Sequence, residues 1–120
     1  LHLHQCGLSQ LSRALTAVVH AVMREASTRA ILPRWRQLAG HEVEEKQSGG
    51  LLPDVVTIAD REAEAILADG LSRIAPEAAV VGEEAAHADP TLLARLDDQL
   101  CWIIDPLDGT NNFAAGERPF

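Results

Sequence analysis

The sequence predicts an α+β fold in which amphipathic helices pack against a small buried sheet. Apolar residues recur at helical spacing in two segments, at about residues 11–31 and 58–74. Two short apolar runs, at residues 79–81 and 101–104, have the length of buried strands, and each continues directly into acidic residues. Hydrophobic residues make up 47% of the sequence but aromatic residues only 3%, so the core must consist mainly of Leu, Val, Ile and Ala.

We expect residues 1–8 to form a loose N-terminal segment, because they show no clear period, and residues 9–120 to belong to one domain. The sequence begins with Leu1 rather than Met and stops at Phe120, just after a segment rich in Gly, Asn and Pro. A chain of 120 residues buries only about two thirds of its unfolded surface. We therefore expect the domain to be incomplete, with a processed domain as the alternative.

The sequence favours a cytoplasmic protein without a membrane partner. Its longest apolar stretches, residues 17–19 and 101–104, are far shorter than the roughly 20 residues of a membrane-spanning helix. The first residues lack the basic start of a signal peptide. The two cysteines, Cys6 and Cys101, form neither a disulfide framework nor a metal-binding spacing.

Charge is distributed unevenly along the chain. Residues 1–40 contain five Arg and one Glu, whereas residues 41–120 contain five basic and 17 acidic side chains. The acidic part repels phosphate backbones, so we expect no nucleic-acid partner. A solvated acidic surface accounts for such an excess, and the alternative is that some of these carboxylates bind a metal ion.

The first half of the sequence predicts a helix and then a hairpin. The helix starts after Ser9 as its N-cap and is ended or kinked by Pro33. Residues 39–54 are punctuated by Gly and Pro, which is typical of a loop or hairpin, with short strands at about 41–47 and 51–56. The helix stripe expected to face the core consists of Leu11, Leu15, Val18, Val19, Val22 and Met23.

Two further helices are predicted. Thr57 and Asp60 have the spacing of a capping box, with Thr57 as the N-cap of a helix that Pro76 ends. A short helix is expected at residues 90–99. The inward face of the longer helix consists of Ala63, Ile66, Leu67, Leu71 and Ile74. Its solvent face is expected to contain Arg61, Glu62, Glu64 and Asp69.

Carboxylates follow both strand candidates. The first strand ends at Glu83-Glu84, and the second runs into Asp105 and Asp108. A carboxylate at the end of a buried strand is costly unless it is paired or bound to a cation, and Arg95 is the only Lys or Arg in residues 74–117. A hard divalent cation such as Mg²⁺ satisfies several oxygen ligands at once. By spacing alone, a metal site and an ordinary Asp/Gly turn are equally open.

The segment that follows the second strand suits a metal or phosphate site. Pro106 stiffens a turn that brings the carboxylates of Asp105 and Asp108 and the carbonyl of Leu107 to one side. The next residue, a glycine, lets a ligand approach the backbone closely. If a helix begins there, its first N–H groups cradle a phosphate, and the following threonine hydroxyl orients a water.

These residues resemble the signature of the inositol monophosphatase family, a group of Mg²⁺-dependent, lithium-sensitive phosphatases of sugars and polyols. The signature occupies residues 102–113 as WIIDPLDGTNNF. Eight fixed positions, at roughly one in twenty each, match by chance on the order of 10⁻¹⁰ per site. Three upstream pieces follow the order of the family: Lys46, DVVTIAD at residues 54–60 and VGEE at residues 81–84. The details are more similar to the inositol-phosphatase branch than to the nucleotide or fructose bisphosphatase branches.

The resemblance implies a layered αβαβα sandwich, of which residues 9–120 supply the N-terminal helix-and-sheet portion while the C-terminal half is absent. Family members take another Asp ligand for the second metal from a Trp-Asp motif in that half. Here Trp35 precedes Arg36 and Trp102 precedes Ile103, so the motif does not occur. We therefore expect the 120-residue chain alone to be inactive. We also expect the full-length protein to form a homodimer.

The resemblance also implies the ligands of the site. Glu83, Asp105 and the Leu107 carbonyl hold a first Mg²⁺, and Asp105 and Asp108 share a second. The substrate phosphate contacts Leu107, Asp108, Gly109 and Thr110.

The attacking water is assigned to another group of residues. By resemblance, Asp60 and Thr110 form a pair that, together with Glu83, positions and activates this water, so no protein nucleophile is needed. The alternative for Asp60 is a capping role only. Glu84 is either a residue behind the ligands or a surface carboxylate.

The predicted function is Mg²⁺-dependent hydrolysis of a small polyol phosphate, such as an inositol monophosphate, by a metal-activated water. One alternative is a histidinol-phosphate phosphatase, because relatives with the same motifs hydrolyse that ester. The other is a truncated, non-catalytic metal-binding or interaction module. The expected small-molecule partner is a phosphorylated polyol.

Overall fold

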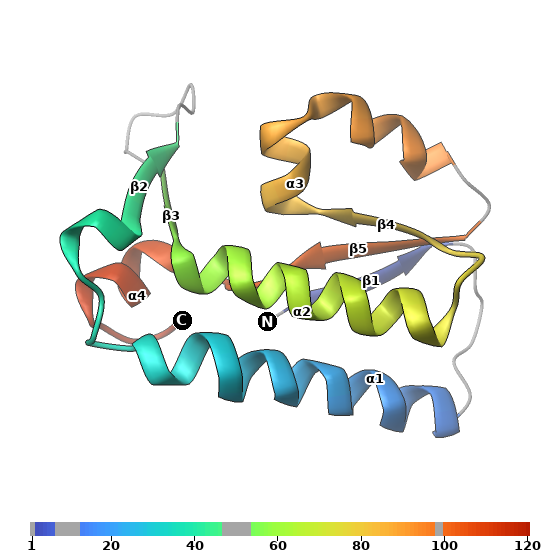
Figure 1. The fold of residues 1–120 in the computed structure, drawn as a ribbon, viewed down its shortest axis with the longest axis horizontal. Helices are drawn as coiled ribbons and strands as arrows, with labels where there is room; N and C mark the ends of the chain where they lie inside the picture. Colours follow the sequence, from blue (N-terminus) through green and yellow to red (C-terminus); the bar gives the residue numbers. More distant parts are fainter. Residues whose placement is uncertain (1, 7–12, 47–53, 98–99) are drawn as a thin grey trace.

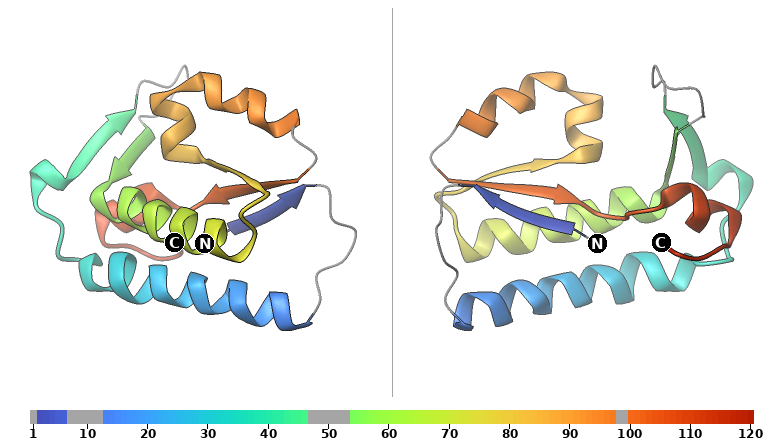
Figure 2. Two further views of the ribbon diagram at one scale, coloured as in Figure 1. Left: turned by 45° about the vertical axis from the view of Figure 1, so that its right-hand side comes forward. Right: turned by 180° about the vertical axis from the view of Figure 1, so that it is seen from behind.

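The computed structural model of the chain describes residues 2–6, 13–46, 54–97 and 100–120. Its elements form layers: α1 packs on α2, α2 covers one face of a sheet, and α3 with the 3₁₀ helix η4 covers the other face (Figures 1 and 2). This arrangement confirms the predicted α+β class. The helices are α1 (Arg13–Ala26), α2 (Ile58–Ile74), α3 (Glu83–Ala88), η4 (Pro90–Asp97) and α4 (Thr110–Ala115).

The main sheet has three strands in the order β1 (His2–Cys6), β5 (Cys101–Asp105) and β4 (Ala79–Gly82). β5 runs parallel to β4 and antiparallel to β1. Because β4 and β5 are parallel and Gly82 pairs with Ile104, the acidic residues that follow both strands emerge at the same edge of the sheet. β2 (Val43–Lys46) and β3 (Asp54–Thr57) form a separate antiparallel pair at one end of the molecule (Figure 1).

The core lies on both sides of α2. The predicted inward face is confirmed, since Ala63, Leu67 and Leu71 are fully buried and Ile66 and Ile74 pack against them. These side chains meet Trp102 and Ile104 of β5, and Phe113 of α4. On the opposite face of the sheet, Val81 and Cys101 form a smaller cluster that packs against α3.

The first helix follows the prediction with one error. Ser9 and Leu11 lie outside the described residues, and the helix continues through a π-helical turn, η1 (Ser27–Ile31), into a 3₁₀ turn, η2 (Leu32–Arg34). Val18, predicted to face inward, is 48% exposed, whereas Val19 is buried. Successive helical residues point about 100° apart, so only one of the two valines faces the core.

The prediction of a loose segment at residues 1–8 is wrong for His2–Cys6, which form β1. Without β1, the backbone N–H and C=O groups along one side of β5 would have no strand partner in the described sheet. Pairing with an edge in this way depends on a segment about a hundred residues distant, which local periodicity does not reveal. The division of the chain at residue 9 stays a prediction.

The hairpin is confirmed as β2 and β3, although its turn at residues 47–53 lies outside the described residues. His41, predicted to begin a strand, lies instead in the 3₁₀ turn η3 (Gly40–Glu42). The helix expected at residues 90–99 is the 3₁₀ helix η4, which ends at Asp97. The helix α3 was not predicted, because its residues, EEAAHA, contain no apolar stripe.

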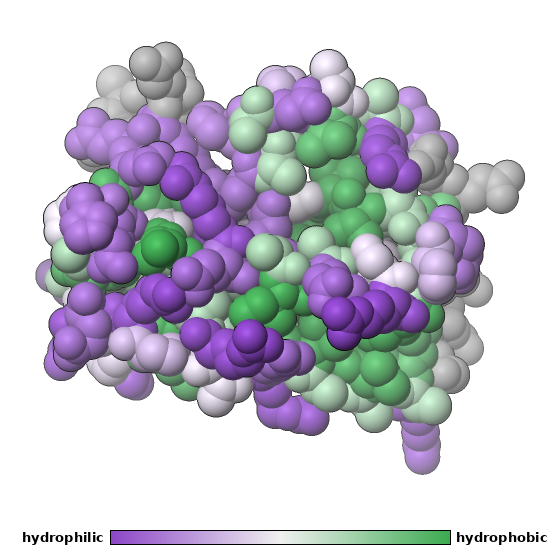
Figure 3. All heavy atoms as spheres, in the orientation of Figure 1, coloured by the Kyte–Doolittle hydropathy of each residue, from purple (hydrophilic) through white to green (hydrophobic). Residues whose placement is uncertain are grey.

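Hydrophobic residues are concentrated over the half of the molecule that contains β4 and η4, whereas hydrophilic residues dominate around β2 and β3 (Figure 3). Leu93 and Leu96 of η4 are partly exposed there. Together with Val81 and Ile103 they line an apolar groove on the face of the sheet opposite α2. Among the described residues, none of the helices has the length and apolar character needed to cross a membrane.

Close packing of α1 on α2 makes the effect of a substitution at Gly70 depend on Val22. A Cβ at residue 70 would lie 2.5 Å from Cγ1 of Val22 and 2.9 Å from Cγ2. Overpacking of this kind costs about 1–3 kcal/mol, more than the roughly 1 kcal/mol by which Ala exceeds Gly in helix propensity. We expect Gly70→Ala to lower the free energy of unfolding in the parent chain but to raise it in a Val22→Ala background. Urea unfolding of the four chains measures both effects, and stabilisation in both backgrounds would contradict the close packing.

Candidate active site

The loops after β4 and β5 form a pocket of about 260 Å³ at the edge of the sheet. The predicted metal ligands and phosphate-binding residues, which come from two strands, are brought together here. The lining residues are Glu83, Asp105, Leu107, Asp108, Gly109, Thr110 and Asn111.

The loop after β5 turns at Gly109 and enters α4. Gly109 has φ +73°, in the left-handed region that favours glycine, and its carbonyl accepts a hydrogen bond from the N–H of Phe113 at 3.0 Å. A helix begins at Thr110, which is the condition for its first N–H groups to contact a phosphate. The backbone of this turn faces the pocket beside the two aspartates.

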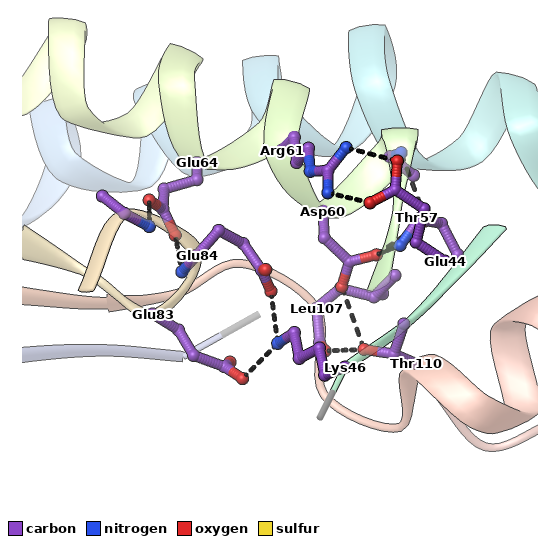
Figure 4. Close-up of polar contacts among 12 residues, drawn as sticks. Glu44, Lys46, Thr57, Asp60, Arg61, Glu64, Glu83, Glu84, Leu107 and Thr110 are labelled. Carbon is purple, nitrogen blue, oxygen red and sulfur yellow. Dashed lines mark hydrogen bonds and ion pairs between the residues drawn. The ribbon is translucent and has the colours of Figure 1, made fainter. Parts of the chain in front are cut away.

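Asp60 connects the start of α2 to this loop (Figure 4). Its Oδ2 accepts hydrogen bonds from the N–H of Thr57 at 2.7 Å and from the hydroxyl of Thr57 at 2.6 Å, which confirms the capping box. Its Oδ1 lies 2.9 Å from the hydroxyl of Thr110, which also lies 2.9 Å from the carbonyl of Leu107. The two interpretations of Asp60 are therefore compatible, because each carboxylate oxygen has a different partner.

Lys46 supplies the positive charge that the neighbouring sequence lacks. Its Nζ lies 2.8 Å from an oxygen of Glu83 and 2.8 Å from an oxygen of Glu84 (Figure 4). The side chains of Lys46 and Glu84 are only 6% and 9% exposed, whereas that of Glu83 is 47% exposed. Glu84 is thus a nearly buried partner of Lys46 rather than a surface carboxylate. Lys46 was one of the sequence pieces on which the family resemblance is based, but no role was predicted for it.

Burial and pairing have opposite effects on these groups. Burial disfavours the charged ammonium of Lys46, but hydrogen bonds and Coulomb attraction from Glu83 and Glu84 outweigh it and raise the pKa of Lys46. Burial raises the pKa of Glu84, and the hydrogen bond from Lys46 opposes this increase only in part. The ion pair with Lys46 therefore compensates part of the cost of burying the Glu84 carboxylate away from solvent.

Glu64, predicted to face solvent, is instead buried, with 7% of its surface exposed. It lies one helical turn after Asp60 and on the same face of α2. Its carboxylate accepts the backbone N–H of Glu84 at 2.7 Å and that of Ala85 at 2.8 Å. Burial raises the pKa of Glu64, and these two hydrogen bonds oppose the increase.

The donor set of the pocket suits a hard cation, because it consists of three carboxylates and a backbone carbonyl. Lys46 already contacts Glu83 with a positive charge, as a cation at that position would. In the part of the chain that the structure describes, no three His, Cys, Asp or Glu side chains are close enough together to form a metal cluster. The assignment of individual ligands therefore stays a prediction.

Comparison with known sequences decides the family. A model described as "Inositol monophosphatase family" matches residues 12–120, almost the whole chain. The chain belongs to the inositol monophosphatase family. The resemblance seen in its motifs is confirmed, and the layers described above are a partial inositol monophosphatase-like fold.

Individual relatives agree with the family. An inositol-1-monophosphatase of Synechocystis sp. is 39% identical over 92 residues, which are 75% of this chain and 30% of that protein. The Nus factor SuhB of Vibrio cholerae is 43% identical over 63 residues, or 52% of this chain and 22% of that protein. An inositol-1-monophosphatase of Mycobacterium bovis is 41% identical over 64 residues, or 52% of this chain and 21% of that protein. The chain thus spans less than a third of the length of these relatives. No solved structure matches it significantly.

The Lys46 pair predicts a measurable difference between a buried and an exposed ion pair. Lys46→Met leaves the nearly buried Glu84 without its counter-charge, and removing one partner of a buried pair lowers stability by about 3 kcal/mol. Adding Glu84→Gln should recover much of this loss, because no buried charge then remains unpaired. Urea unfolding at neutral pH measures the changes.

The matched control is Arg61→Met. Arg61 forms an ion pair with Glu44, but both side chains are more than half exposed, so solvent screens their attraction. We expect this variant to lose much less stability than Lys46→Met. Equal losses in the two variants would contradict the structural importance of Lys46.

Proposed function

We propose that the protein is a Mg²⁺-dependent phosphomonoesterase that hydrolyses a small polyol phosphate of the inositol monophosphate kind. The observation that supports this proposal is a single pocket. It combines oxygen donors from Glu83, Asp105, Leu107 and Asp108 with the hydroxyl of Thr110, which the buried Asp60 orients. Family membership and the names of two relatives, both inositol-1-monophosphatases, support the reaction class.

Two groups of oxygen atoms are the proposed metal ligands. Glu83, Asp105 and the Leu107 carbonyl would hold one Mg²⁺, and Asp105 and Asp108 would supply two of the ligands of a second. When bound, such cations neutralise a phosphate, lower the pKa of a water and stabilise a leaving alkoxide. Lys46 keeps Glu83 in place at the rim of the pocket through their 2.8 Å contact.

The proposed role of Asp60 and Thr110 follows from their hydrogen bonds. Thr57 fixes one oxygen of Asp60, so the other oxygen is held toward the hydroxyl of Thr110. When that hydroxyl donates its proton to Asp60, the lone pairs of Thr110 Oγ1 accept a hydrogen bond from a water in the pocket. Together with the carboxylate of Glu83, which lines the same pocket, this arrangement orients the water toward the phosphorus atom of the substrate.

The substrate phosphate is proposed to lie against the turn from Leu107 to Thr110. Helix N-termini favour anions, so the N–H groups at the start of α4 are the proposed donors, and Gly109, which has no side chain, lines the same pocket. Asp108, which lines the same turn, adds a negative charge, so the phosphate binds there only with metal cations present. Phosphate binding is therefore expected to depend on Mg²⁺.

A chimera tests the whole proposal. The aligned segment of this chain, 75% of its length, replaces the matching segment of the Synechocystis relative, and phosphate release from inositol 1-phosphate and from histidinol phosphate is measured with and without Mg²⁺. We expect Mg²⁺-dependent release from inositol 1-phosphate by the chimera, and none by the 120-residue chain alone. Faster release from histidinol phosphate would favour the alternative substrate. A folded chimera that releases phosphate from neither ester would favour a non-catalytic module, a role with which the name Nus factor SuhB of one relative is compatible. The homodimer, the cytoplasmic location and the lack of a nucleic-acid partner stay predictions.

Substitution of Asp105 tests the metal ligands. Asp105→Asn removes a negative charge proposed to contact both cations, so we expect Mg²⁺ binding to the chain to weaken at least tenfold and phosphate release by the chimera to stop. Isothermal titration with Mg²⁺ measures the binding. Asp97→Asn, which removes the same charge at the end of η4, is the control and should bind Mg²⁺ like the parent. Release within tenfold of the parent would contradict the assignment.

Substitution of Asp60 separates catalysis from capping. Asn retains much of the capping geometry, whose complete loss costs about 0.5–2 kcal/mol, but it is a poor proton acceptor for Thr110. We expect Asp60→Asn in the chimera to lower kcat by about 10² or more while the melting temperature changes little. Near-normal turnover would leave Asp60 with the capping role alone.

A further inference from the structure

The first turn of α3 is capped by a residue of another helix. Gly82 is the N-cap position of α3 and has no side chain, so it forms no side-chain cap hydrogen bond. The N–H groups of Glu84 and Ala85, the second and third residues of the helix, are instead bonded to the two carboxylate oxygens of Glu64 (Figure 4). These are the groups that an N-cap side chain normally satisfies.

The position of Glu64 explains why residue 82 is a glycine. Gly82 has φ −94° and ψ 151°, a backbone conformation that any residue adopts. A Cβ at this position would lie 2.6 Å from Oε2 of Glu64 and closer still to Oε1 and Cδ. The carboxylate of Glu64 thus occupies the space that a side chain at residue 82 would fill. Such a side chain would have to displace the carboxylate from its two N–H donors, so space rather than conformation favours glycine here.

We propose that Glu64 is a positioning residue: it caps α3 from α2 and thereby fixes the backbone from which the Glu83 and Glu84 side chains extend. Where it concerns metal binding, this inference rests on the proposed function, in which Glu83 is a ligand. Lys46 holds the other ends of both glutamates. Glu83 is therefore oriented from its backbone by Glu64 and from its carboxylate by Lys46.

A capping residue on α2 has a consequence that a local cap would lack. Asp60 and Glu64 lie one turn apart on α2; Asp60 holds the loop after β5 through Thr110, and Glu64 holds the start of α3 after β4. The same helical turn thus sets the distance between Glu83 and the Asp105–Thr110 loop. A serine at residue 82 would cap α3 but would not connect it to α2.

Reciprocal substitutions test the capping. Glu64→Ala frees the N–H groups of Glu84 and Ala85, and Gly82→Ser in the parent chain forces the new side chain against the Glu64 carboxylate. In the double variant, the serine occupies the vacated space and accepts one of the two N–H groups as a local N-cap. We expect each single substitution to accelerate amide hydrogen exchange at Glu84 and Ala85 about tenfold. The double variant is expected to return at least one of the two amides to within threefold of the parent rate.

The same chains are titrated with Mg²⁺ alone. Residues that orient metal ligands typically change affinity 10–100-fold when lost, so we expect Glu64→Ala to weaken Mg²⁺ binding about tenfold and the double variant to recover most of this loss. Because serine is neutral, such recovery cannot come from charge. Glu62→Gln, at a half-exposed glutamate of α2 that pairs with Arg34, controls for net charge. Val22→Ala controls for a general loss of stability, and both controls should bind Mg²⁺ like the parent.

The outcomes separate this inference from the proposed function. Unchanged exchange at Glu84 and Ala85 in Glu64→Ala, or a double variant at least as impaired as the worse single variant, would overturn the capping role. Recovered exchange without recovered Mg²⁺ affinity would overturn the positioning of Glu83. A parent chain that binds no Mg²⁺ would overturn the proposed function, whereas the exchange rates alone would still decide whether Glu64 caps α3.

Discussion

The geometry of the pocket depends on one turn of α2, where two buried carboxylates anchor two different loops. Asp60 and Glu64 are 1% and 7% exposed, and buried carboxylates are costly unless their oxygens are satisfied. Each is satisfied by donors from outside the helix interior: Thr57 and Thr110 for Asp60, and two backbone N–H groups of α3 for Glu64. Moving α2 relative to the sheet would break the hydrogen bond between Asp60 and Thr110 and would separate the Glu64 carboxylate from its two N–H donors, so the position of α2 is coupled to both strand ends.

Charge balance then explains why β2 belongs to the site. The edge where β4 and β5 end gathers acidic side chains, and the only Lys or Arg near them in sequence is Arg95 of η4. The compensating ammonium comes from Lys46, which is almost completely buried between Glu83 and Glu84. This contact links the β2–β3 sheet to the start of α3, in addition to the Arg61–Glu44 ion pair and the packing of β3 against α4. Neutralisation is partial, which leaves the pocket attractive to further cations.

Contacts between residues close together in the sequence were predictable from local patterns, whereas contacts between distant residues were not. The capping box at Thr57 involves neighbours three residues apart, so a local pattern predicted it, whereas the start of α4 after Gly109 was considered only as a condition for phosphate binding. The clustering of acidic residues at one edge of the sheet was predictable because both strand candidates run directly into acidic residues. The burial of Glu64 was not predictable in this way, because its partners are 20 and 21 residues away and belong to a helix without an apolar stripe. β1 was missed for the same reason: its partner strand lies at the other end of the sequence.

Glycine is favoured for two different physical reasons at Gly82, the last residue of β4, and at Gly109, which follows β5. Gly109 has a positive φ, so any side chain there would strain the backbone wherever it pointed. Gly82 has an ordinary backbone, and glycine is favoured there because any side chain would displace the Glu64 carboxylate. Replacing Gly109 would need a residue that tolerates the left-handed conformation and a shift of the backbone of Pro119 and Phe120, which would lie 3.1 Å from the new Cβ. Gly82 is replaceable when its neighbour Glu64 also changes. The glycine and the two glutamates at residues 82–84 therefore have to be interpreted together with Glu64, which lies one turn after Asp60 in α2. The spacing from Asp60 to Glu64 thus becomes part of the pattern that builds the pocket.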